Sequence, residues 1–319
     1  MHTSRFSVFA SALLVSASVA ACGSSSTDSQ VGGSNAGANA QGGLSIVLPN
    51  GGDGNASAGN GGTGNVSSGT LPPGFTAADK FGGYKLGDPI EGGSGAGASS
   101  AGASNGSDGC GTTILAVIRD FEPDGQNFEG NTGDDLNLVE KELGADRKPV
   151  FAPSGPTRTV QDPAQFADWY RNVDGLNKPF KLEIWFGPNN GVSSFQSTKF
   201  FPLDGVGFGN HGSDHNFHFT TEIHTQFKYG GGEQFSFTGD DDVWVFINSK
   251  LAIDLGGVHI AETASIDIDQ RASELGLVKG EVYPFDMFQN ERHTSESNFR
   301  ADTDLNFVDC GTIVPEVPK

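Results

Sequence analysis

Three consecutive aspartates, Asp240, Asp241 and Asp242, are the residues whose types and spacing point most clearly to chemistry. They stand between two predicted strands at residues 233–238 and 243–247, which are rich in aromatic and β-branched residues. Adjacent carboxylates repel each other unless a cation compensates them, and Ca²⁺ takes about six to eight oxygen ligands. The pattern therefore predicts a calcium site, with a solvated acidic turn as the alternative.

Other polar residues suggest two further kinds of site. Four histidines lie close together in sequence: His211, His215, His218 and His224. Strand geometry is expected to disperse them, which argues against a zinc site. Glu222 and His224 are neighbours on one face of the strand and are expected to be a solvated or hydrogen-bonded pair. Paired acids could also serve a glycosidase. No nucleophile elbow, phosphate loop or zincin helix is present in the sequence, so we expect no enzymatic activity.

The elements that must position these side chains are predicted to be mostly strands. Residues 217–229 alternate between apolar and polar side chains, and three glycines then turn the chain. Further strands are predicted at 113–120, 251–255, 264–268, 282–288 and 299–307, with short helices at 135–143 and 164–173. Closely spaced strands of this kind predict a mainly β fold, an antiparallel, jelly-roll-like β-sandwich with a few short helices.

The N-terminal third is predicted to be a leader followed by a tether. Residues 1–22 resemble a lipoprotein signal peptide whose lipobox ends at Cys22, the expected lipidation site; the alternative is an ordinary signal peptide. Residues 23–109 are a low-complexity Gly/Ser-rich stretch, expected to be a disordered, flexible linker. Within it, residues 71–89 contain Phe75, Phe81 and Tyr84 and either dock or stay loose.

The other two cysteines bracket the predicted domain, which spans residues 110–310 and leaves a short tail at 311–319. In an exported protein Cys110 and Cys310 are expected to form a disulfide; free thiols or intermolecular bridges are the alternatives. The net charge of −20 argues against nucleic acid as a partner and against electrostatic adhesion to anionic lipid. Membrane attachment is therefore expected through the lipid anchor only, and Gly23 after Cys22 favours the outer membrane and the cell surface.

Several long motifs carry a family resemblance. They lie at residues 166–177, 200–210, 215–259, 275–280 and 291–300. Together they resemble the fibro-slime domain family, a branch of the lectin-like β-sandwich superfamily named for the protective antigen's N-terminal domain. The resemblance covers residues 113–310.

The resemblance implies a site as well as a fold. In the sugar-binding members, two consecutive aspartates joined by a cis peptide bind Ca²⁺, and the ion chelates sugar hydroxyls; Asp240 and Asp241 match that pair. Asn290 and Glu291 are the candidate partners from a second loop, while Asp242 is either a third ligand or a turn cap.

Three further residues are candidates for ligand binding: Asp254, His259 and Arg292. The expected function is that of a cell-surface lipoprotein whose β-sandwich binds an extracellular carbohydrate or matrix polymer through Ca²⁺. The first alternative is a structural, self-associating matrix protein in which Ca²⁺ only stabilises the fold, and a glycoside hydrolase is the second. The sequence identifies neither the glycan nor the oligomeric state.

Overall fold

The computed structural model describes residues 69–90, 111–293 and 295–313, all within one unit of the chain. The two helices described there are not long and apolar enough to cross a membrane. The elements, in chain order, are β1 (Thr76–Ala77), β2 (Gly83–Pro89), β3 (Thr113–Phe121), β4 (Gly133–Asp134), α1 (Pro163–Phe166), β5 (Asn177–Trp185), β6 (Gly187–Asn189), β7 (Val192–Ser197), β8 (Phe219–Lys228), β9 (Gln234–Gly239), β10 (Val243–Ile247), β11 (Lys250–Leu255), β12 (Gly257–Val258), β13 (Glu262–Asp267), α2 (Ile268–Leu275), β14 (Val282–Glu291), β15 (Phe299–Thr303) and β16 (Asn306–Asp309).

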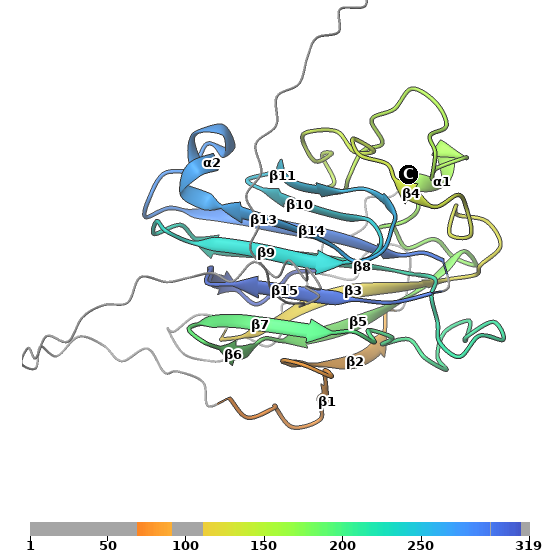
Figure 1. Ribbon diagram of the computed structural model, residues 1–319, viewed down its shortest axis with the longest axis horizontal. Coiled ribbons are helices and arrows are strands. Elements are labelled where there is room, and N and C mark those ends of the chain that lie inside the picture. Colours follow the sequence, from red (N-terminus) through yellow and green to blue (C-terminus); the bar gives the residue numbers. More distant parts are fainter. Residues whose placement is uncertain (1–68, 91–110, 294, 314–319) are drawn as a thin grey trace, which may run out of the picture. The chain divides into compact units, whose positions relative to one another are not determined.

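Two antiparallel sheets form the framework (Figure 1). The larger sheet has nine strands in the order β1-β2-β5-β3-β8-β14-β10-β11, with β16 also paired to β8. The smaller sheet has five strands in the order β13-β9-β15-β7-β6. Aromatic residues from both sheets fill the space between them, including Phe235, Phe237 and Phe299 from the smaller sheet and Phe219 and Phe285 from the larger one. The predicted mainly β sandwich is therefore confirmed.

A second apolar cluster covers the other face of the large sheet. Long connections between β3 and β5 contribute Phe166 and Trp169, which pack with Trp244 of β10. Strands β8 and β10 are consequently covered on both faces, and even the polar residues of β8 are mostly buried. The alternating apolar and polar residues at 217–229 therefore lie on two faces that are both packed, rather than on one packed and one solvated face.

Glu222 and His224, on one face of β8, form the expected hydrogen-bonded pair within a larger buried network. Nδ1 of His224 also lies 2.6 Å from Oδ1 of Asp286, and Arg119 and Lys148 both donate to Glu222. Burial alone would raise the pKa of Glu222, but the positive charges of Lys148 and Arg119 outweigh it and hold that pKa well below its ordinary value.

Two local predictions were wrong. Residues 135–143 form a turn followed by irregular chain rather than a helix, because their backbone bonds to other segments: the Glu140 N–H donates to the Val150 carbonyl, and the Leu143 N–H to that of Ser249. The second predicted helix is limited to Pro163–Phe166, with Asp162 as its N-cap. Helix α2 was also missed: strand β13 ends at Asp267, and the same residue is the N-cap of the helix that follows.

The segment at 71–89 docks, so the flexible linker does not extend unbroken to residue 109. Strand β2 pairs with β5 on the side that β3 leaves open, from Gly83 opposite Trp185 to Pro89 opposite Phe180. Tyr84 contacts Phe200 edge to face, with ring centroids 5.7 Å apart. Tyr84 and Leu86 pack against the main core and supply apolar contacts that the surrounding Gly/Ser sequence lacks, which is why this stretch can order.

Candidate functional site

The three aspartates form the connection between the two sheets. Strand β9 of the small sheet ends at Gly239, and β10 of the large sheet begins at Val243. The peptide bond between Asp240 and Asp241 is cis, as the resemblance implied. Asp240 and Asp241 keep 3% and 5% of their surface exposed, whereas Asp242 keeps none. The first two carboxylates therefore lie nearer to solution than the third.

Asp240 and Asp241 are held by backbone donors from two neighbouring loops. Asn298 donates to Asp240 through its backbone N–H at 2.5 Å and through its side-chain amide at 3.1 Å. Asp241 accepts from the backbone N–H of His259 at 3.0 Å and from that of Arg292 at 2.9 Å. The loops that begin after β12 and after β14 thus fix the direction of both carboxylates.

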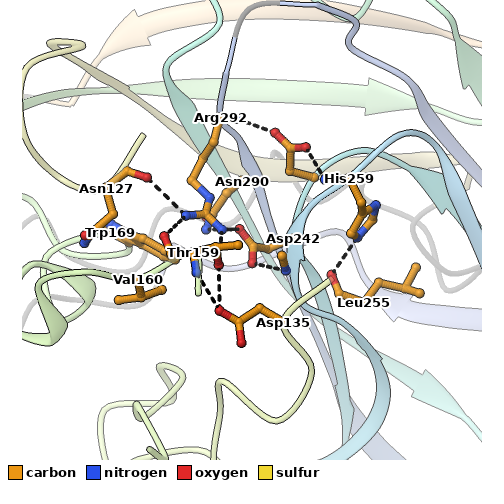
Figure 2. Close-up of polar contacts among 12 residues, drawn as sticks. Asn127, Asp135, Thr159, Val160, Trp169, Asp242, Leu255, His259, Asn290 and Arg292 are labelled. Carbon is orange, nitrogen blue, oxygen red and sulfur yellow. Dashed lines mark hydrogen bonds and ion pairs between the residues drawn. The ribbon is translucent and has the colours of Figure 1, made fainter. Parts of the chain in front are cut away.

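Asp242 points into the protein and anchors a buried arginine. Its carboxylate lies 2.7 Å from a terminal guanidinium nitrogen of Arg292 and accepts from the Gly257 N–H at 2.6 Å. Gly257 has φ of 126°, and a Cβ there would lie 2.4 Å from the Gly133 carbonyl oxygen, so only glycine fits this donor position. In Figure 2 the Arg292 guanidinium lies between Asp242 on one side and Asn127 and Thr159 on the other. It donates to the carbonyl oxygens of Asn127 and Thr159.

Adjacent residues at the end of β14 serve opposite faces of the strand. The Asn290 amide donates to Asp242 at 3.2 Å, and its oxygen accepts from the Tyr170 hydroxyl at 2.5 Å. Glu291 is on the other side, where the carboxylates of Asp241 and Asp240 act on it electrostatically. Of the two candidate partners from this strand, Glu291 therefore lies with the outer aspartates and Asn290 with Asp242.

The site holds more buried carboxyl groups than its one arginine can balance. Burial raises the pKa of Asp241 well above its ordinary value, although the charge of Arg292 opposes the shift. Burial, reinforced by Asp241 and Asp240, likewise raises the pKa of Glu291 well above its usual range. Burial also raises the pKa values of Asp240 and Asp242, against hydrogen bonds from Asn298 and the charge of Arg292. All four acids would gain from a nearby cation.

One carboxylate oxygen in this cluster has no hydrogen-bond partner and could therefore bind a metal ion. Oε2 of Glu291 is buried and has no hydrogen-bond partner, and the residue is only 1% exposed. Within the described part of the chain, no three or more His, Cys, Asp or Glu side chains are already arranged to hold a metal ion. The donor chemistry, hard carboxylate oxygens with an excess of negative charge, nevertheless fits Ca²⁺, and Asp240, Asp241 and Glu291 are the residues that would hold it.

The three candidates for ligand binding differ in what their side chains are free to do. Arg292 has no exposed side-chain surface, because its guanidinium packs 4.9 Å from the Trp169 ring and on Asp242, so its role is structural. Asp254 accepts from the Trp244 indole N–H at 3.1 Å and the Asn137 N–H at 2.9 Å. The His259 ring lies against the carbonyl oxygens of Ile260 and Leu255, at 2.9 and 3.4 Å, in the loop beside Asp241.

Sequence reasoning did not assign roles to Asn298 and Tyr170. Both lie inside the motifs that carried the resemblance, at 291–300 and 166–177, so the motifs held the only signal. Of the remaining predicted residues, Cys22 and Cys110 lie outside the described residues. Lipidation and the pairing of Cys110 with Cys310 therefore stay predictions.

Comparison with known proteins finds a described family that part of this chain is similar to. Residues 206–319 match the model of the PA14 domain. Two Dictyostelium discoideum proteins are similar: psiR is 40% identical over 217 residues and psiD 39% over 213 residues, each match covering 61% of this chain. The chain covers 21% of psiR and 42% of psiD, less than half of either relative. A solved PA14 domain of the MpAFP antifreeze protein shares 12% identity and covers 65% of this chain and 94% of that chain, with a TM-score of 0.29.

Proposed function

We propose, from the premise that a PA14 domain is present in this chain, that its β-sandwich binds an extracellular carbohydrate or matrix polymer through a Ca²⁺ site. The PA14 domain suggests a carbohydrate-binding or adhesion role. Asp240, Asp241 and Glu291 hold the ion in this proposal. When bound, Ca²⁺ supplies free coordination positions that vicinal hydroxyls of a sugar can fill.

The observation that carries the proposal is the unbalanced charge at the connection between the sheets. Four buried carboxyl groups, those of Asp240, Asp241, Asp242 and Glu291, face one buried guanidinium. The Arg292 guanidinium pairs with Asp242 and acts on Asp241 only through its charge, so among the described residues Asp240, Asp241 and Glu291 have no ion-pair partner. A divalent ion would remove the repulsion among these groups, so its binding is favoured by the fold itself.

Each group of the site has a distinct role in this arrangement. Asn298 and the backbone N–H groups of His259 and Arg292 orient the two outer carboxylates. Asp242 and Asn290 take no part in ligation, because their polar atoms already bond to each other and to the protein. His259 and Asp254 shape the neighbouring loop, where a bound polymer would make its secondary contacts.

Calorimetric titration with Ca²⁺ tests the metal site directly. We expect saturable binding by the wild type and its loss in Asp241→Asn and in Glu291→Gln, while the exposed-site control Glu274→Gln binds normally. An unchanged isotherm in both site variants, with folding verified by circular dichroism, would remove Asp241 and Glu291 from the site.

A glycan array and a set of matrix polysaccharides, probed with and without chelator, test the ligand. Binding that disappears on chelation while the far-ultraviolet spectrum stays native supports the proposal. The burial of Asp240 and Asp241 to 3% and 5% exposure favours one alternative, a self-associating matrix protein in which Ca²⁺ only stabilises the fold. That alternative predicts a lower melting temperature on chelation and no glycan signal under either condition.

The wider setting belongs to the same proposal. The fibro-slime motifs and the lipobox at Cys22 support an exported lipoprotein that is anchored to the outer membrane and faces the cell surface. We place binding, not catalysis, at the site. Mass spectrometry of the mature N-terminus tests the anchor: an acyl-modified cysteine is expected, and an unmodified terminus elsewhere would contradict it.

A further inference from the structure

Two histidines that the sequence was expected to disperse lie side by side. His211, in the loop that precedes β8, has its ring centroid 5.9 Å from that of His218, and the two ring planes are inclined by 70°. His218 is nearly buried, with 3% exposure, while the His211 side chain keeps 18%. Strand geometry separates residues within β8, but His211 returns through a loop, which the periodicity argument could not anticipate.

Each ring has a carboxylate on one of its nitrogens. Nε2 of His218 lies 2.7 Å from Oε1 of Glu129, and Nδ1 of His211 lies 3.4 Å from Oε2 of Glu122. A carboxylate holds a proton on the nitrogen that faces it, so the other nitrogen of a neutral ring carries a lone pair. Nδ1 of His218 is that nitrogen, and it is buried with no hydrogen-bond partner.

This pattern is the one that metal-binding histidines adopt. A metal-ligating imidazole usually donates its second N–H to a carboxylate, which fixes the tautomer and the ring orientation. Burial of His218 lowers the pKa of its imidazole, which favours the neutral form that a metal requires. An unpartnered buried nitrogen is otherwise costly, so the site gains from any ligand that fills it.

The spacing of the rings admits one ion between them. With a metal–nitrogen distance of about 2.1 Å, the ring centroid of a ligating histidine lies about 3.2 Å from the ion. Two such rings have centroids about 5.2 Å apart at a tetrahedral angle and about 6.4 Å apart when opposite. The observed 5.9 Å falls within that interval.

We propose that His211 and His218 bind a first-row transition metal ion of the Zn²⁺ type, with Glu129 as the carboxylate that orients His218. The described part of the chain contains no set of three or more arranged metal-binding side chains, so the ion would need water or another ligand in its remaining positions. This site is separate from the proposed Ca²⁺ site, since imidazole nitrogen suits zinc and clustered carboxylate oxygen suits calcium. The two proposals therefore stand or fall independently.

Zn²⁺ titration of the tag-free full chain in saturating Ca²⁺ tests the site by competition with a chromophoric chelator. His211→Ala is the main variant, because its partly exposed side chain can be removed with little effect on packing. We expect Zn²⁺ affinity to fall at least about tenfold in His211→Ala and by a similar factor in Glu129→Gln. His215→Ala is the matched control, since that ring lies in the same loop but pairs with Asp204 and stacks on Phe201, and it should bind as the wild type does.

Cobalt substitution supplies a second readout that does not depend on affinity. Co²⁺ in the wild type should give visible absorption bands of a nitrogen-ligated ion, and His211→Ala should lose them. Equal Zn²⁺ affinity in the wild type and His211→Ala, or an equal loss in His215→Ala, would overturn the proposal. A wild type that binds no Zn²⁺ would also overturn it and would mean that water alone partners His218.

Discussion

The Asp242 carboxylate and the Arg292 guanidinium lie 2.7 Å apart with no exposed side-chain surface on either residue. This pair ties the connection between the sheets to the end of β14. Removing one partner of a buried pair leaves an uncompensated charge, which typically costs about 3–5 kcal/mol. We expect Arg292→Met to lower the free energy of unfolding by about that amount in a urea titration.

A surface ion pair provides the comparison for this variant. Arg271 lies 2.6 Å from Glu274 on α2, with 35% and 64% of the side chains exposed. Arg271→Met should change the free energy of unfolding by less than about 1 kcal/mol. Similar decreases in the free energy of unfolding in Arg292→Met and Arg271→Met would show that the buried Asp242–Arg292 pair stabilises the fold no more than a surface pair does.

The raised pKa of Asp120 predicts that the free energy of unfolding depends on pH. The residue is fully buried, and burial raises its pKa to about 6, against hydrogen bonds from Asn216 and Phe208. Between pH about 4 and pH 6 the folded state binds a proton that the unfolded state has released, so stability falls as pH rises through this window. The shift corresponds to about 3 kcal/mol at pH 7.

The variant Asp120→Asn isolates this contribution from those of other groups. Its free energy of unfolding, measured by urea titration from pH 4 to 7, should lack the decline that Asp120 causes, so its difference from the wild type should grow with pH up to about 6. Glu222, whose pKa is lowered, contributes with the opposite sign in both proteins and cancels in the difference. A difference that stays constant across the range would contradict the assignment.

Tyr170 supports the inner face of the site. Its buried hydroxyl donates to the Asn290 oxygen at 2.5 Å, and burial raises its pKa well above the ordinary value, so it remains a donor at neutral pH. Tyr170→Phe should lower the free energy of unfolding by about 1–3 kcal/mol. Calorimetry should show unchanged Ca²⁺ affinity, because Asn290 lies on the face opposite Glu291.

Tyr229→Phe is the control for that variant, because its hydroxyl donates at 2.6 Å to Asp269, an acid at the surface. Its loss should stay below about 1 kcal/mol, since water can satisfy Asp269. A fall in Ca²⁺ affinity for Tyr170→Phe alone would instead make Asn290 a ligand.

The pairing of β2 with β5 predicts how far the chain can be truncated from its N-terminus without loss of stability. A chain that begins at residue 69 should keep the stability of the full chain. One that begins at residue 91 should melt at a lower temperature and associate, because it exposes the edge of β5. Calorimetry and light scattering measure both effects, and equal melting temperatures would show that β2 adds nothing to the sheet.

Strands with strong local patterns were predictable. The run at residues 243–247 became β10 with identical bounds, because aromatic and β-branched residues leave few alternatives there. Residues 135–143 were misread because Leu136, Val139 and Leu143 have helical spacing, yet Leu136 is exposed and isolated bridges pair Val139 with Phe151 and Glu142 with Lys250 of β11. Distant partners decided that segment, and a local pattern does not encode them.

The candidate site was predictable in part for a similar reason. The aspartate triplet could be recognised, because adjacent carboxylates are unusual in themselves. Which of Asn290 and Glu291 lies with the outer aspartates depends on which face of β14 contacts Tyr170. That contact can be seen only in the three-dimensional structure. The same limit applied to His211 and His218, which a loop brings together.

The placement of Asn290 and Glu291 on opposite faces of β14 has an evolutionary consequence. Asn290 contacts Asp242 and Tyr170 in the interior, while Glu291 lies on the other face of the strand, where Asp240 and Asp241 act on it electrostatically. Descendants of such a gene could exchange the residue at position 291 while Asn290 keeps its contacts with Asp242 and Tyr170. The proposed ion site would then change through a few codons on an unchanged framework.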